Sequence, residues 1–286
     1  MSINFRTLKN RQFEDVRHRY GATDSMLYAL GIGMGTDPSD LDQLRYVYEQ
    51  ALLAVPTMAV VLGCPGFWMR SPDTGLDWKK ILHVEQELNM HQTLRPSGEV
   101  IGKTVIESIV DKRSAGALLT TRRDVVDAAT SEIVASTRSV ILCRGDGHFG
   151  GGDPASPPSR WCPQGPPDRT CILPSSAQSA LIYRLSGDDN PLHADIRVAQ
   201  NAGFERPILH GLCTFGMAGH AALRTLCAYD PARLKKLKLK FSSPFYPGES
   251  LKTVFWTHGH GSATFQCYSL QRDVMVIHHG VVEYIE

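Results

Sequence analysis

The sequence predicts an α+β protein of two similar halves, in which each half wraps an antiparallel sheet around a helix. Three observations support this prediction. The chain has 286 residues, a length that suits two domains of roughly 130 residues better than one. A stretch rich in proline and glycine divides the chain near its middle. On each side of this stretch, a helical pattern comes first and strand patterns follow.

The dividing stretch covers residues 151–174 and contains two runs dense in proline and glycine, which begin at Gly151 and Pro163. Proline lacks a backbone N–H and therefore breaks helices and central strands. We expect a linker that crosses the surface between an N-terminal domain, residues 1–150, and a C-terminal domain, residues 175–286.

The second half contains the clearest helix and strand patterns. Residues 212–229 are rich in alanine and leucine and contain no proline, which predicts a long buried helix. Apolar residues then alternate with lysine over residues 237–241, the period of a half-buried strand. Further strands are predicted at residues 251–257, 263–270 and 274–284, with short turns between them.

The first half repeats this order less clearly. Asp40 or Ser39 can cap a helix over residues 41–53. Strands are predicted at residues 82–88, 100–109, 115–121 and 132–143. A Pro-Ser-Gly-Glu turn at Pro96 and a Pro-Gly-Glu turn at Pro247 precede strands in the two halves, a weak sign of duplication. A helix wrapped by an antiparallel sheet, twice over, is a double hot-dog.

Composition excludes several classes of partner. The formal net charge is +1, which argues against a broad surface for nucleic acid or for an anionic membrane. No apolar run approaches the roughly 20 residues that span a bilayer, and the N-terminus lacks the apolar core of a secretion signal. The seven cysteines form no Cys-x-x-Cys pair, so reduced thiols are the simplest interpretation. We expect a soluble, cytoplasmic protein.

Two motifs that suggest a cofactor or a metal fail on physical grounds. Residues 145–150 match the dinucleotide pattern G-x-G-x-x-G, but Gly-Gly-Asp-Pro follows and cannot begin the helix that receives a pyrophosphate. Asp188, His193 and His210 could be drawn as metal ligands, yet their spacing is not diagnostic of zinc. We expect neither a cofactor nor a metal.

The segment from Gly187 to His193 has the residues for acid–base chemistry. Gly187 permits a sharp turn, and Pro191 disfavours helical geometry at Asn190. The resulting polar loop places the Asp188 carboxylate and the His193 imidazole five residues apart, where both can face one small volume. Such a pair can hold a water molecule, with one group taking its proton while the other positions it or returns a proton.

A donor for negative charge follows closely in the sequence. Gly211 opens the long helix, where unpaired N–H groups point outward and the helix dipole favours an anion. The alternative interpretation is structural: Asp188 and Asn190 are ordinary turn formers, and His193 caps a neighbouring element. The residues of the loop alone leave both interpretations open.

The length of a wider match favours the catalytic interpretation. The loop motif and the later Pro-Ile-Leu-His-Gly-Leu-Cys-Thr-Phe-Gly resemble the signature of the hydratase 2 family, the (R)-specific 2-enoyl-CoA hydratases among MaoC-like proteins. This family includes the hydratase unit of peroxisomal multifunctional enzyme type 2. The resemblance extends over nearly the whole chain, and further matching segments begin at Leu27, Tyr48, Leu82, Phe149 and Lys240.

The resemblance implies a fold and a reaction. The fold is a double hot-dog whose N-terminal central helix is shortened, and the reaction is reversible hydration of trans-2-enoyl-CoA to (3R)-3-hydroxyacyl-CoA by a homodimer without a cofactor. The implied catalytic residues are Asp188, His193, Asn190, Gly211 and, from the other domain, Glu49. For Glu49, an exposed helix glutamate is the alternative.

The resemblance also implies contacts with the CoA ester at His83, Val84, Lys112 and Phe241. Lys112 suits a phosphate, although a solvated lysine fits the sequence nearly as well. Residues 63–70 depart from the relatives, which leaves the acyl preference open. Two alternatives remain: a hydratase or dehydratase for a specialised acyl thioester, branched or dicarboxylic, and an inactive hot-dog that only binds acyl thioesters.

Overall fold

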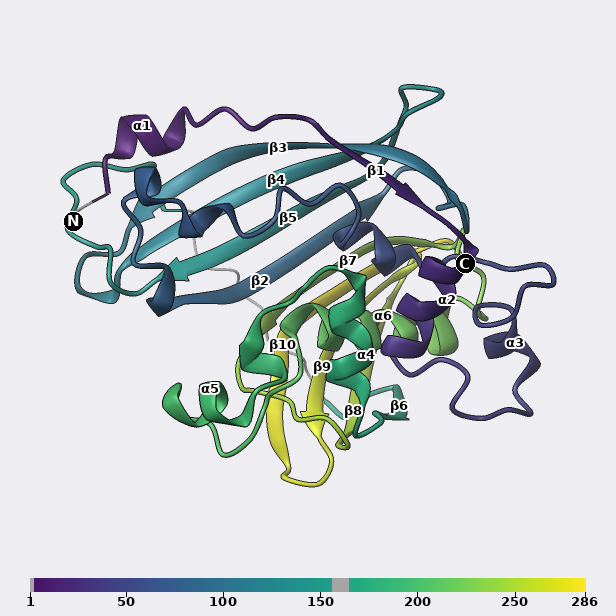
Figure 1. The fold of residues 1–286 in the computed structure, drawn as a ribbon. Coiled ribbons are helices and arrows are strands. Elements are labelled where there is room, and N and C mark those ends of the chain that lie inside the picture. The colour runs from purple at the N-terminus through teal and green to yellow at the C-terminus, as the bar shows by residue number, and fades with distance from the viewer. Residues whose placement is uncertain (1–2, 156–164) are drawn as a thin grey trace.

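The computed structural model describes residues 3–155 and 165–286. Within these residues the strands form one antiparallel sheet of ten strands, in the order β1-β3-β4-β5-β2-β7-β10-β9-β8-β6 (Figure 1). The first half contributes β1 (Val16–Tyr20), β2 (Ile81–Met90), β3 (Gly98–Asp111), β4 (Ala117–Asp127) and β5 (Ile133–Cys143). The second half contributes β6 (Arg169–Pro174), β7 (Leu234–Phe241), β8 (Ser250–Gly259), β9 (Ser262–Ser269) and β10 (Val274–Tyr284).

The strand order confirms the predicted double hot-dog. Counted inward from either edge, each half presents its own strands in the order first, third, fourth, fifth, second. The two halves meet where β2 pairs with β7, with Glu85 opposite Lys240. The two similar Pro-Gly turns noted in the sequence precede β3 and β8, which occupy equivalent places in their halves. The two similar turns therefore precede matching strands of the two halves.

The two halves differ in the helix between their first and second strands. In the second half this helix is α6 (Gly211–Leu226), which is buried along most of its length. In the first half the segment that packs against β2, β5 and α6 is only η1 (Pro56–Val60), a 3₁₀ segment whose five residues are all buried. Helix α6 contacts η1 and β2 as well as β7, so it packs against both halves. This is the shortened N-terminal helix that the resemblance implies.

The shorter helices lie outside the sheet (Figure 1). They are α1 (Phe5–Lys9), α2 (Ala22–Gly31), α3 (Leu41–Leu44), α4 (Ser179–Tyr183) and α5 (Ile196–Asn201). Helix α2 packs on α4 and was not predicted from the sequence. Within the described residues, no helix has the length and apolar character that crossing a membrane requires.

The helix predicted over residues 41–53 is wrong beyond its first turn. Asp40 caps α3 as expected, since its side chain accepts hydrogen bonds from the backbone N–H groups of Asp42 and Gln43. The helix then ends because Tyr46 turns into the core, where its hydroxyl donates to the Tyr229 carbonyl at 2.7 Å. Tertiary packing overrides local helix propensity here.

The predicted linker over residues 151–174 is also wrong at its C-terminal end. Residues 169–174 form β6, an edge strand that pairs with β8. Cys171 and Leu173 point into the core while their neighbours are exposed, and Pro174 is tolerated because it ends an edge strand. Residues 156–164, which include Cys162, lie outside the described residues, and the domain boundaries otherwise stay a prediction.

The apolar residues form two separate cores. The larger one surrounds α6 and joins both halves. The smaller one lies on the first half, where Ile109, Leu119 and Cys143 of the sheet are fully buried. Phe13, Trp68 and Met69 cover this smaller core from the segments outside the sheet. The loop between η1 and β2 therefore has its own packing surface.

We expect Gly216→Ala to destabilise the contact between α6 and the first half. A β-carbon at Gly216 would lie 2.5 Å from Ile32 Cγ2 and 2.9 Å from Tyr28 Oη. Overpacking should lower the free energy of unfolding by about 1–3 kcal/mol, more than the roughly 1 kcal/mol that alanine gains in a helix. Urea unfolding measures this change. Gly151→Ala is the control, because its β-carbon would meet only Phe5 at 4.0 Å. Equal stability of the two variants would show that the contact tolerates a methyl group.

Candidate active site

The loop from residue 187 to 193 is stabilised by hydrogen bonds from its own backbone to its own side chains. Gly187 has a φ of 109°, a conformation that favours glycine. Asp188 Oδ1 accepts from the Asn190 N–H at 3.2 Å, and Asn190 Oδ1 accepts from the Leu192 N–H at 3.1 Å. The chain then enters η7 (Pro191–His193). These bonds form the tight polar loop that the sequence predicts.

His193 is held as a neutral base. Its side chain is buried, and Nδ1 lies 2.8 Å from the Ile208 carbonyl oxygen. Because a carbonyl can only accept, Nδ1 carries the proton and Nε2 keeps a free lone pair. Burial lowers the pKa of His193, while the bond to Ile208 and the charge of Asp188 partly oppose that shift. Near pH 7 the imidazole is therefore neutral and can accept a proton.

His210 is a buried partner that the sequence suggested only as a metal ligand. Its ring lies on that of His193, with centroids 3.8 Å apart and planes inclined by 31°. Its Nε2 lies 3.3 Å from the Asp188 carbonyl oxygen, to which it donates. Burial and the neighbouring His193 lower the pKa of His210 to about 3, so it stays neutral. The one clue in the sequence was its position directly before Gly211.

The three side chains form one cluster. One carboxylate oxygen of Asp188 and one ring nitrogen from each of His193 and His210 all lie within 4.8 Å of one another. Such a set could hold a metal ion, although one nitrogen of each histidine is already bonded to a backbone carbonyl. A metal-free, cofactor-free site stays a prediction. The geometry equally suits a water molecule between a carboxylate and a neutral imidazole.

The N-terminus of α6 lies beside this cluster. Gly211 is the first residue of the helix and follows His210 directly. The N–H groups of a first helical turn have no partner inside the helix and attract an anion. A β-carbon at Gly211 would come within 3.5 Å of the Phe241 ring. Glycine therefore keeps the approach to this N–H group free of a side chain.

Two of the four predicted CoA contacts, His83 and Phe241, lie near this helix end. The His83 ring packs edge-on against Phe241 at 5.2 Å, and Phe241 in turn touches Gly211. Val84 lies at the irregularity in the pairing of β2 with β5. Lys112 is different: it is exposed and follows the end of β3, on the side of the sheet where β2 begins.

Glu49 is not part of the cluster. It lies in the turn region after α3, and its side chain is exposed. Within residues 3–155 and 165–286 it takes part in no hydrogen bond or ion pair. Its catalytic role stays a prediction, and the structure favours the alternative of a solvated glutamate.

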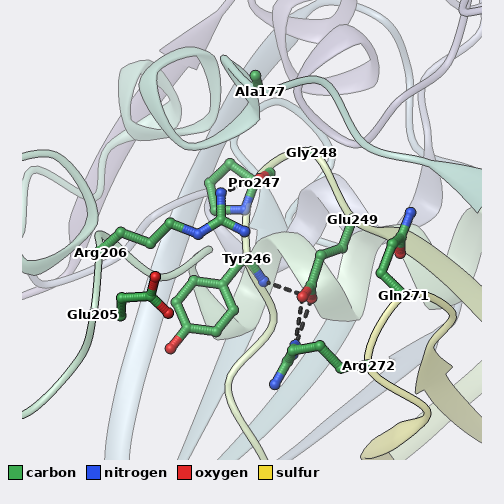
Figure 2. Close-up of a pocket in the computed structure, with 9 residues that line it drawn as sticks. All are labelled: Ala177, Glu205, Arg206, Tyr246, Pro247, Gly248, Glu249, Gln271 and Arg272. Carbon is green, nitrogen blue, oxygen red and sulfur yellow. Dashed lines mark hydrogen bonds and ion pairs between the residues drawn. The ribbon is translucent and has the colours of Figure 1, made fainter.

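A separate cleft of about 340 Å³ lies on the second half (Figure 2). Arg206 and Arg272 each lie 4.9 Å from the centre of the Tyr246 ring, and Arg272 forms an ion pair with buried Glu249. Neither Asp188 nor His193 lines this cleft. Because the cleft lies apart from the Asp188–His193 pair, we assign it no role in the chemistry.

Fold and site together define a double hot-dog protein in which a half-buried aspartate and a buried histidine meet at a helix N-terminus. Comparison with known proteins agrees: residues 18–145 match the MFE-2 hydratase 2 N-terminal domain family, and residues 162–278 match the MaoC like domain family. The 3-hydroxyacyl-thioester dehydratase Y of Mycobacterium tuberculosis is 36% identical over 269 residues, which cover 92% of each chain.

Two further relatives cover both halves. The peroxisomal enoyl-CoA hydratase 2 of Arabidopsis thaliana is 33% identical over 90% of this chain and 88% of its own. The crystal structure of a MaoC-like dehydratase from Phytophthora capsici has a TM-score of 0.86 and 33% identity, with 98% of each chain covered. The chain therefore belongs to the hydratase 2 family of MaoC-like proteins.

We expect His210→Phe to lower kcat about tenfold or more while the protein stays folded. Phenylalanine keeps a ring against His193 but removes the donor to the Asp188 carbonyl, so the loop loses one anchor. His220→Phe is the matched control, because His220 is a buried histidine of α6 that bonds to the Tyr229 hydroxyl away from the cluster. The control should lose stability and keep its kcat. An equal loss of kcat in both variants would contradict a positioning role for His210.

Proposed function

We propose that this protein catalyses the reversible addition of water to trans-2-enoyl-CoA thioesters, which gives (3R)-3-hydroxyacyl-CoA. It is then a hydro-lyase. One observation carries the proposal: in a chain of the hydratase 2 family, a carboxylate and a neutral imidazole meet beside a helix N-terminus. Hydration of a conjugated thioester requires an acid, a base and a donor to the thioester oxygen, and these three groups can supply them.

The geometry supports a simple division of roles. A water molecule held between Asp188 and His193 Nε2 loses a proton as its oxygen adds to C3 of the enoyl group. The proton returns to C2, so the elements of water are added without other reactants. Negative charge that develops on the thioester oxygen is stabilised by the Gly211 N–H at the start of α6. Asn190 holds the loop in shape through its bond to the Leu192 N–H.

The same site would serve the two narrower alternatives. A branched or dicarboxylic acyl thioester would use the same residues with a different acyl pocket. Dehydration is the reverse reaction, and the relative from Mycobacterium tuberculosis is named a dehydratase. A hot-dog that only binds thioesters is disfavoured, because Asp188, Asn190, His193 and Gly211 are all present and arranged together.

We also propose that the protein acts in the cytoplasm as a homodimer. The described cysteines are all free, and five of the six are buried, which suits a reducing compartment. The dimer rests on the resemblance to the family alone. The substrate partner is an acyl-CoA, and a net charge of +1 favours neither nucleic acid nor a membrane surface as a further partner.

We expect Asp188→Asn and His193→Ala each to lower the hydration rate about a hundredfold or more, the usual contribution of a general acid or base. Loss of the enoyl absorbance of crotonyl-CoA and 2-decenoyl-CoA measures the rate, and chiral analysis shows whether the product is the (3R) alcohol. Asp189→Asn is the matched control: this neighbour is exposed and should change the rate less than threefold. A loss below tenfold in either catalytic variant would refute the assignment.

We expect activity to persist below pH 6.5 before it falls on the acid side. The neutral form of His193 accepts the proton, and burial lowers the pKa of this histidine from its ordinary 6.5. A lowered pKa keeps the imidazole neutral to a lower pH, so the acid limb of kcat/KM should have its midpoint below 6.5. A midpoint at or above 6.5 would contradict the role of a buried neutral base.

A further inference from the structure

Two exposed aromatic side chains of the first half lie against each other. Phe67 is 45% exposed and Trp78 is 36% exposed. Their rings meet edge to face, with centroids 6.0 Å apart and planes at 90°. Neighbouring Trp68 instead turns inward and packs against Phe13 over the smaller core. The smaller core therefore offers a place to bury aromatic residues of the loop between η1 and β2. Phe67 and Trp78 nevertheless remain exposed to solvent.

Cations surround the exposed pair. The Arg70 guanidinium lies 5.1 Å from the centre of the Trp78 ring, and Lys79 Nζ lies 5.7 Å from it. Among the residues that the structure describes, neither Arg70, Lys79 nor Lys112 forms an ion pair. Unpaired cations beside aromatic faces can bind anions and flat rings at the same time.

A buried carboxylate fixes the position of Trp78. This residue begins η4 (Trp78–Lys80), which leads directly into β2. Asp146 is buried and accepts from the Asp77 N–H at 3.1 Å, just before η4. At the other end, the backbone N–H and Nε of Arg144 both donate to the Lys80 carbonyl at 3.3 Å. The exposed tryptophan is therefore presented by a segment anchored at both ends.

The exposed aromatic pair and its neighbouring cations lie directly before the predicted CoA contacts in the chain. From η4 the chain enters β2, and His83, its third residue, reaches Phe241 and so the start of α6. Figure 1 shows β2 running from this end of the first half to its junction with β7. Lys112 lies at the same end of the sheet, three strand spacings or roughly 14 Å from the start of β2.

We propose that Phe67, Trp78 and Arg70 bind the nucleotide end of the CoA thioester, a site that rests on the proposed function. CoA joins its thioester to an adenine ring, a 3′-phosphate and a diphosphate through an extended arm. The adenine stacks on the exposed aromatic pair, as bases do on aromatic side chains. Arg70, Lys79 and Lys112 receive the phosphates.

Substrates with and without the nucleotide test this site. For Trp78→Ala and for Arg70→Ala we expect the KM for crotonyl-CoA to rise roughly tenfold with kcat nearly unchanged. The KM for the N-acetylcysteamine thioester, which lacks the nucleotide, should not change. Arg19→Ala is the matched control for charge, since Arg19 is an exposed arginine on β1 at the opposite end of β3. Trp78→Tyr should restore the KM, because tyrosine also stacks.

A binding measurement separates this proposal from the proposed function. Titration calorimetry with adenosine 3′,5′-bisphosphate should show binding to the wild type and at least fivefold weaker binding to Trp78→Ala and Arg70→Ala. Such binding in a protein that does not hydrate enoyl-CoA would overturn the proposed function and keep the nucleotide site. Equal KM increases for both substrates, unchanged binding in the variants, or no binding to the wild type would each overturn the site.

Discussion

The close packing of α6 against the first half determines the geometry of the site. This contact is possible because Gly216 and Gly219 have no side chains where Ile32, Tyr28 and Thr57 approach the helix. One helix thereby serves as the core of two half-sheets, and its position relative to both is set by backbone contact. The N-terminus of α6 then has a fixed direction, and the oxyanion donor that we propose at this end is a backbone N–H group rather than a mobile side chain.

Backbone contacts also explain why the two histidines of the site are buried and neutral. Each histidine of the cluster bonds one ring nitrogen to a backbone carbonyl, His193 to Ile208 and His210 to Asp188. A buried ring nitrogen without a hydrogen-bond partner destabilises the fold, so each of these bonds lowers the cost of burying a ring. Within the described residues, Nδ1 of His210 is buried and has no such partner. Burial of both rings disfavours their charged forms. Both rings are then neutral near pH 7, and Nε2 of His193 remains free to accept a proton.

The sequence predicted a helix or strand correctly where the local residue pattern and the tertiary contacts favour the same structure. Strand β10 lies at the predicted residues 274–284. The predicted alternation over residues 237–241 lies in β7, where Leu237 and Leu239 are fully buried and the lysines are not. The helix over residues 41–53 fails, because burial of Tyr46 opposes local propensity. Strand β6 was hidden by the prolines around it, and the place of His210 depends on a stacking contact across 17 residues of chain. No local pattern contains such contacts.

The glycine-rich residues 145–150 illustrate the same limit. Their match to a nucleotide-binding pattern has a structural explanation, since Gly145 lies close to Asp77 and Gly147 lies against the Arg113 carbonyl. These glycines let the turn after β5 approach both the start of η4 and the β3–β4 hairpin, and so they help to anchor Trp78. The two halves thus differ in what they contain. The second half has the long helix and the proposed acid–base loop, whereas the first half has the short η1 and a loop whose exposed residues we propose to bind substrate.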